Sequence, residues 1–166
     1  MKTISYNNDF AGWAFQQAEL MRAGKLDSLD IANLIEEMEC MGRSEHREFE
    51  SRLVVLIGHL LKWKFQPERQ GNSWKRTIRE QRKSVMKLLK DSPSLKARFN
   101  DGEWYQDIWE SAVTLAISET GLDTFPETPI WTLENEVLLV DFFPTESKED
   151  VCQRSEERRV GKECRS

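Results

Sequence analysis

The stretch LVVLIGHLLKW, residues 53–63, decides the fold of this chain because it is apolar on almost every side. Only His59 interrupts the apolar run between Arg52 and Lys62, and the run is far shorter than the roughly 20 residues that span a bilayer. A helix that is apolar all round is buried among other elements. The stretch therefore predicts a central helix, from Ser44 to about Phe65, with other helices packed round it.

Two shorter amphipathic helices are expected before this central one, over residues 9–24 and 27–42. Asp9 can cap the first of them, and Gly24 and Gly42 are typical helix-ending residues. Asp27 or Ser28 can cap the second, whose apolar face consists of Ile31, Leu34, Ile35, Met38 and Met41. Because the turn between the two helices is short, we expect them to pack antiparallel.

Further helices are expected on the carboxyl-terminal side. They are a helix capped by Ser73 and ending near Asp91, a short one at 95–99, a long one from about Trp104 to Gly121, and a short one from Thr132 to about Val140. An extended strap over 125–129 precedes the last of these. Residues 136–143 could pass as a buried strand, but the preceding cap favours helix. We predict an all-α fold, an antiparallel helical bundle of about five main helices plus short helices, as a single domain over 1–150.

Composition restricts the class of protein. With 166 residues and 39% hydrophobic content, the chain has material for one core of ordinary size. The amino-terminal MKTISYNNDF lacks the apolar core of a secretory signal, which predicts a cytoplasmic protein without a membrane partner. Cys40 and Cys152 form no C-x-x-C pair, and His46 and His59 are the two histidines. We therefore expect no disulfide framework, no metal site and no cofactor.

Six segments in one order carry a family resemblance. They are DFAGWAFQQAELMRAGKLDSLDIANLIEEMECMGRSE (residues 9–45), HLLKWKFQPERQGNSWKRTIREQR (residues 59–82), DSPSLKARF, ETGL, FPETPIWTLE and DFFP. Over Asp9 to Pro144 the chain resembles the bacterial domain-of-unknown-function 29 family, which is abundant in cyanobacteria. The resemblance implies an all-helical fold, and it implies no activity and no site residues.

The carboxyl-terminal RSEERRVGKECRS, residues 154–166, is similar to the translation of a common short-read sequencing adapter. We expect it to be foreign to the protein and expect 151–166 to be a disordered tail. A genuine charged tail is the alternative. In both cases Cys164 and the Arg158-Arg159 pair lie outside the fold.

Charge is distributed unevenly along the chain. Residues 1–50 carry five basic and ten acidic side chains, residues 51–100 carry thirteen and three, and residues 101–153 carry one and thirteen. The helix after Ser73 carries most of the basic excess, which makes Arg76, Arg79 and Arg82 candidate phosphate-binding residues. A charge run more often only solvates a helix face. Salt bridges to acidic helices are the simpler interpretation, with partners among Glu36, Glu37, Glu39, Asp107 and Glu110.

Polar residues interrupt several apolar stripes. Gln81 falls between Ile78 and Val85, His59 lies in the most apolar stretch, and Gln17 interrupts the first helix. A buried polar group without a partner costs about 1–3 kcal/mol, so we expect a hydrogen-bond network among these three. Such a network either fixes helix register or forms the floor of a binding pocket.

Arg52 and His59 form the one candidate catalytic pair. Seven residues apart, they share a helix face to within roughly 20 degrees. Histidine as general acid or base and arginine as a charge stabiliser would suit RNA cleavage, as in metal-independent helical ribonucleases of the HEPN class. Leu53 stands where that class usually has a polar residue, and arginine–histidine pairs are common in helices by chance.

One tryptophan stands apart from the helical apolar positions. Trp131 lies beside Pro129 on the strap and is a candidate exposed anchor for a partner. We therefore interpret the chain as a protein-interaction or regulatory module with an unknown protein partner and no chemistry of its own. Nucleic-acid binding through the basic helix is the first alternative, and ribonuclease activity is the second.

Overall fold

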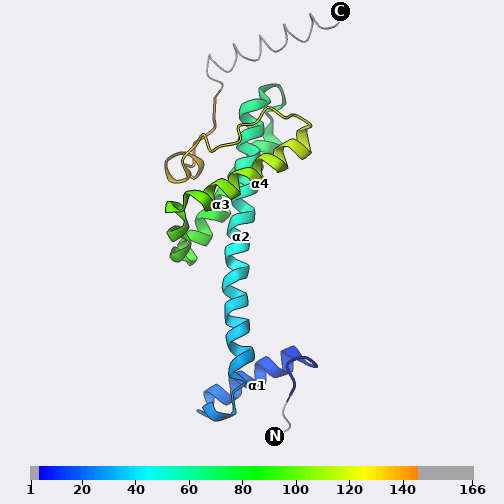
Figure 1. The fold of residues 1–166 in the computed structure, drawn as a ribbon, viewed down its shortest axis with the longest axis vertical. Coiled ribbons are helices and arrows are strands. Elements are labelled where there is room, and N and C mark those ends of the chain that lie inside the picture. Colours follow the sequence, from blue (N-terminus) through cyan, green and yellow to red (C-terminus); the bar gives the residue numbers. More distant parts are fainter. Residues whose placement is uncertain (1–3, 146–166) are drawn as a thin grey trace, which may run out of the picture. The chain divides into compact units, whose positions relative to one another are not determined.

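The computed structural model describes residues 4–145, and within that range every regular element is helical. Four α-helices are present: α1 (Phe10–Arg22), α2 (Ile31–Phe65), α3 (Asn72–Asp91) and α4 (Gly102–Thr120). Four shorter elements complete the order, namely η1 (Leu26–Ser28), η2 (Pro67–Arg69), the eight-residue η3 (Pro93–Asn100) and the π-helical η4 (Leu133–Val137). The all-α prediction is confirmed, with α1 to α4 and η3 as the substantial helices (Figure 1).

The chain divides into two compact units, which we describe separately. Unit 1 is Met1–Arg47 and unit 2 is Glu48–Ser166, so α2 contributes its first half to one and its second half to the other. The prediction of a single domain over 1–150 stays a prediction. The adapter-like segment 154–166 lies outside the described residues, as does the rest of the expected tail. No helix within residues 4–145 is both long and apolar enough to cross a bilayer.

Unit 2 is built round the second half of α2, as its sequence predicts. Five apolar side chains of this segment have no exposed surface: Leu53, Leu56, Ile57, Leu60 and Leu61. Helices α3 and α4 lie against this segment and supply the rest of the core with apolar side chains of their own (Figure 1). The prediction that residues 53–63 are hidden from water on most sides is confirmed.

Glycine at position 58 lets α2 and α4 approach closely. A Cβ atom at Gly58 would lie 3.2 Å from a Leu115 methyl carbon and 3.3 Å from the Ala112 carbonyl oxygen. The ends of α4 follow local sequence signals, because the Asp101 carboxylate accepts a hydrogen bond from the Trp104 N–H and Gly121 adopts φ +70°. The predicted end at Gly121 is therefore confirmed.

The strap after α4 is held to that helix by side chains that bind main-chain oxygens. The Trp109 indole donates to the Pro126 carbonyl at 2.8 Å, and the Tyr105 hydroxyl donates to the Trp131 carbonyl at 2.8 Å. Burial raises the pKa of the Tyr105 hydroxyl, so it remains a donor. These bonds fix a segment that has no helical or sheet bonds of its own.

Unit 1 is organised round the carboxylate of Asp30. Asp9 caps α1 by accepting from the Gly12 N–H, as predicted. The Trp13 indole donates to Asp30 at 3.1 Å, and buried Gln17 accepts from the Asp30 N–H at 2.8 Å. Asp30 also accepts from the Asn33 side chain at 2.7 Å at the start of α2. Asp30 therefore caps α2, which begins at Ile31, and the prediction of Asp27 or Ser28 as the cap is wrong.

Two expectations for unit 1 are wrong. First, α2 continues through Gly42 and Ser44, so the two predicted helices are one helix of 35 residues. A helix-interior glycine costs only about 1 kcal/mol and does not end a helix by itself. Second, Ile31, Ile35, Met38 and Met41 are exposed, although the antiparallel packing predicted for the first two helices would have covered them.

Candidate functional site

The most distinctive surface of unit 2 is a row of basic side chains on α3. Its five members are all exposed: Arg76, Arg79, Lys83, Lys87 and Lys90. Their spacing of three, four, four and three residues places them along one face of the helix, which we call the basic face. The opposite side of α3 is buried through Ile78, Val85 and Leu89. The pattern arises because a buried apolar stripe leaves the charged residues of the same helix in water.

No side chain of the basic face forms a salt bridge within residues 4–145. Within unit 2, the salt bridges expected from this helix to Asp107 and Glu110 on α4 are not formed among the described residues. Glu110 instead accepts a hydrogen bond from Gln106, a neighbour on its own helix. Two acidic residues of α3, Glu80 and Asp91, are also exposed among these five cations, but neither forms a salt bridge with them within residues 4–145. The face therefore keeps an excess of positive charge.

Arg82, predicted to bind phosphate, does not belong to the basic face. Its side chain is 2% exposed, and its three nitrogens donate to the carbonyl oxygens of Val137, Val140 and Phe142, each at 2.9 Å. Burial lowers the pKa of the guanidinium, and the charge of nearby Asp141 opposes that shift. We remove Arg82 from the phosphate-binding set, because it serves as a clamp between α3 and the end of the described chain.

Gln81 is half-buried and has a different partner from the one expected. It accepts a long hydrogen bond, 3.4 Å, from Arg52 on α2. The predicted network joining Gln81, His59 and Gln17 is wrong, since Gln17 bonds within unit 1 and His59 bonds elsewhere. Gln81 and Arg82 thus bond to neighbouring segments of unit 2, whereas the basic face of α3 is exposed to solvent.

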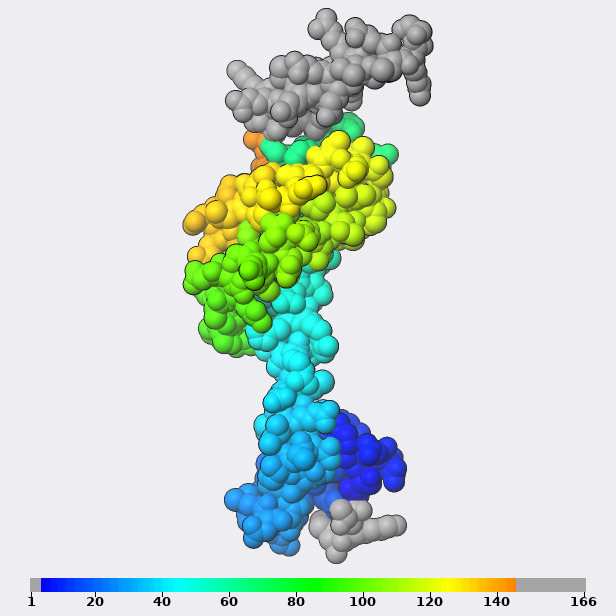
Figure 2. All heavy atoms as spheres, viewed as in Figure 1, coloured from blue at the N-terminus to red at the C-terminus, as the bar shows by residue number. Residues whose placement is uncertain are grey.

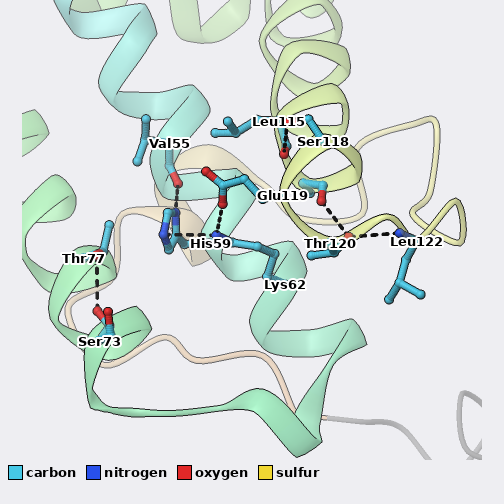
Figure 3. Close-up of polar contacts among 11 residues, drawn as sticks. Val55, His59, Lys62, Ser73, Thr77, Leu115, Ser118, Glu119, Thr120 and Leu122 are labelled. Atoms are coloured by element: carbon cyan, nitrogen blue, oxygen red, sulfur yellow. Dashed lines mark hydrogen bonds and ion pairs between the residues drawn. The ribbon is translucent and has the colours of Figure 1, made fainter.

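His59 lies in a polar cluster with Lys62 and Glu119 (Figure 3). Its Nδ1 lies 2.9 Å from the Val55 carbonyl oxygen, and its Nε2 lies 3.2 Å from the Lys62 ammonium. A carbonyl only accepts and an ammonium only donates, so Nδ1 carries the hydrogen and the ring is neutral. Burial lowers the pKa of His59, and the positive charge of Lys62 adds to that shift.

Lys62 is the surprising member of this cluster. It is 3% exposed, forms an ion pair with Glu119 of α4 and lies 5.2 Å from the centre of the Trp74 ring. Sequence reasoning missed it, because Lys62 reads as the polar end of an apolar run. A basic residue four positions after Gly58, on the side where α4 comes closest, is the signal that could have indicated it.

Each side chain of the predicted catalytic pair, Arg52 and His59, is bonded to partners of its own. The Arg52 guanidinium is bound by Glu48 through Nε and Nη2, and its Nη1 bonds Gln81. Both ring nitrogens of His59 are also occupied. Each residue therefore has a local partner that accounts for its position, and a catalytic role for Arg52 and His59 stays a prediction.

Trp131 is buried rather than exposed, so the prediction of a surface anchor is wrong. It is 7% exposed, and its ring packs edge-on against Trp109 at 5.5 Å and Phe142 at 5.7 Å. The strap folds back on α4, which puts the indole into the core.

Two hollows on the described surface have different linings. Unit 1 has one of about 410 Å³, whose lining includes Trp13, Gln17 and Lys25. Along α4 there is another of about 540 Å³, lined by Asp107, Glu110, Ser111 and Thr114. No group of three or more His, Cys, Asp or Glu side chains within residues 4–145 is placed to hold a metal ion.

Comparison with known proteins adds one finding. A family model described as "Domain of unknown function DUF29" matches residues 5–143. No curated protein and no solved structure matches the chain. The match covers all of the elements from α1 to η4, so the family and the fold described above refer to the same part of the chain.

Proposed function

Since the chain belongs to the DUF29 family, whose description states no activity, we propose from the geometry of unit 2 that it binds the phosphate backbone of a nucleic acid through the basic face of α3. The observation that carries this proposal is that five exposed cations share one helix face without a salt bridge inside the described chain. A face of that kind gains most from a partner that presents regularly spaced negative charge.

The dimensions of the basic face suit a nucleic-acid strand. Arg76 and Lys90 are fourteen residues apart, which corresponds to roughly 21 Å along a helix. One strand of duplex DNA places about six phosphates along that length of its axis. The face is straight because one continuous helix carries it, and the Arg82 clamp fixes that helix to unit 2. Little ordering of the backbone would therefore be needed on binding.

The chemistry of the basic face favours binding without sequence preference. Lysine and arginine contacts to phosphate position a protein on nucleic acid and carry no base information. The chain as a whole has a formal net charge of −5, so long-range attraction is weak and the contact has to be local. We expect modest affinity that depends strongly on salt.

Salt titration tests the proposal. The full chain is mixed with fluorescein-labelled 25-nucleotide RNA or 25-base-pair DNA, and fluorescence anisotropy is followed at several salt concentrations between 25 and 200 mM. For duplex DNA the logarithm of the binding constant falls with the logarithm of salt concentration by about 0.9 per phosphate contact. Five contacts would give a slope of about −4.5, and Lys83→Gln with Lys87→Gln should reduce it by about 1.8.

Two control variants make the same change in net charge elsewhere. One combines Lys25→Gln with Lys96→Gln, both exposed and both outside α3. The other combines Arg158→Gln with Arg159→Gln in the adapter-like segment. The proposal predicts little effect of either control. It is abandoned if no binding is detected at 25 mM salt, or if the controls weaken binding as much as the Lys83 and Lys87 variant.

A second candidate function is protein–protein interaction, the interpretation favoured by the sequence. The observation that supports it is in unit 1, where large apolar side chains of α2 are more than half exposed. A monomer seldom leaves such residues together in water.

A further inference from the structure

The first half of α2 carries a stripe of apolar positions that the described residues of unit 1 leave exposed. Ile31, Ile35 and Met38 are 52%, 53% and 60% exposed, and Gly42 continues the same row. Their spacing of four, three and four residues is that of the seam positions in a helix pair. The amino-terminal segment bonds to other positions, because Tyr6 donates to Glu37 of α2 and Trp13 of α1 donates to Asp30 just before α2. Figure 2 shows this segment, in dark blue, against one side of the first part of α2.

Among the described residues, no contact explains a glycine at position 42. A Cβ atom at this position would meet nothing within 4 Å, and the residue has ordinary helical geometry. Gly58, on the same helix, has an evident purpose, because its missing Cβ admits Leu115 and Ala112 of α4. A glycine in mid-helix weakens the helix. Its presence on the apolar stripe suggests a close contact made from outside the chain.

We propose that this stripe pairs with the same stripe of a second copy of the chain, with the two helices antiparallel. A two-fold axis between Ile35 and Met38 maps the row onto itself, which places Ile31 opposite the partner's Gly42 and Ile35 opposite the partner's Met38. The bulky isoleucine then lies over the position that lacks a side chain. This fit of a large residue to a small one within a single row is the argument for a second copy over a different protein.

The absence of charge on the stripe permits self-pairing, and the small area of the stripe limits the strength of the dimer. The four residues of the stripe are uncharged, and two charged residues beside it, Glu39 and Arg43, form a salt bridge with each other at 3.2 Å. No like charges are therefore brought together along the seam. The row is about 17 Å long. It buries less than the roughly 800 Å² per partner of a standard stable interface, so we expect a reversible dimer with a dissociation constant in the micromolar range.

Analytical ultracentrifugation of the full chain from about 1 to 500 µM tests the pairing. Gly42→Leu should weaken dimerisation at least about tenfold, because it fills the space taken by the partner's Ile31. Cys40→Leu places the same side chain on the opposite side of the same helix, where the native residue is also exposed, and should leave dimerisation unchanged. Gly42→Ala is the safeguard against misfolding, since a Cβ fits there and favours the helix. It should weaken the dimer severalfold while the dilute protein melts at the same temperature or higher.

Disulfide cross-linking tests the orientation. Ile35→Cys and Met38→Cys are made separately in a chain whose three native cysteines are serine. An antiparallel pair cross-links a mixture of the two proteins faster than either protein alone, whereas a parallel pair does the reverse. A chain that stays monomeric at 500 µM, a dimer that Gly42→Leu leaves intact, or a preference for like-with-like cross-links would each overturn the proposal. None of these outcomes bears on the basic face, which is tested separately by salt titration.

Discussion

Replacement of Arg82 by methionine should destabilise unit 2 without weakening phosphate binding. The side chain is 2% exposed and donates three hydrogen bonds of 2.9 Å to main-chain carbonyls. A hydrogen bond with one charged partner contributes about 1.5–3 kcal/mol net. Val137 is fully buried, so its bond counts in full, whereas Val140 is 72% exposed and its carbonyl can regain water.

With the other two bonds at about half strength, the lost bonds amount to about 3–6 kcal/mol. Methionine also removes the cost of burying a guanidinium, which offsets part of that loss. We therefore expect the free energy of unfolding to fall by about 2–4 kcal/mol, equivalent to a decrease in Tm on the order of 10 °C for a unit of this size. Arg82→Lys should be nearly as damaging, since one ammonium cannot reach three separated carbonyls.

Urea unfolding followed by tryptophan fluorescence measures this effect, with Arg79→Met as the matched control on the exposed face of α3. The control should change stability by less than about 0.5 kcal/mol. The reasoning is refuted if Arg82→Met unfolds at the same urea concentration as the native chain. It is also refuted if the variant keeps its stability but loses nucleic-acid affinity, because Arg82 would then contact the ligand.

Three further predictions concern unit 2. Burial lowers the pKa of His59 below its unfolded value of 6.5, so its contribution to stability is complete above about pH 6.5 and is lost as the pH falls through the lower folded pKa. The dependence of Tm on pH between 7 and 5 should therefore be shallower in His59→Gln than in the native chain. An unchanged dependence would contradict the neutral ring. Gly58→Ala should lower the free energy of unfolding in urea by about 1 kcal/mol, because crowding of its Cβ against Leu115 and the Ala112 carbonyl outweighs the gain in helix propensity, and a stabilised variant would show that α4 shifts to make room. Labelled RNA incubated with the full chain in EDTA should remain intact on a denaturing gel, because both ring nitrogens of His59 are occupied by hydrogen bonds. Cleavage that His59→Ala abolishes, with the fold of the variant unchanged, would instead establish ribonuclease activity.

The basic face illustrates how far a helical pattern can be extended into three dimensions. Arg76 and Arg79 were predicted as surface residues from the apolar stripe alone, and both are exposed. The same argument failed for Arg82, because the helical period places it at the border of the stripe. Its burial depends on three carbonyls that lie 55 to 60 residues further along the chain. The sequence around Arg82 does not indicate hydrogen-bond partners that are so far away in the chain.

The prediction that Trp131 is exposed was wrong for a similar reason. Pro126 and Pro129 within the strap correctly indicated an extended segment without regular structure. Whether such a segment stands away from the protein or folds back on it depends on hydrogen-bond donors elsewhere. Here Tyr105 and Trp109 of α4 bind the strap and bring the indole into the core.

What local chemistry dictated was the helical class, the cap at Asp9, the end of α4 at Gly121 and the burial of residues 53–63. Each depends on interactions within one or two helical turns, or on apolar content that must leave water wherever it lies. What only the folded chain decided was the unbroken course of α2 through Gly42, the ion pair of Lys62 with Glu119, and the choice of which arginine of α3 faces solvent. These depend on distant segments meeting, and the free energy of such a meeting is a property of the whole packed unit rather than of any stretch of sequence.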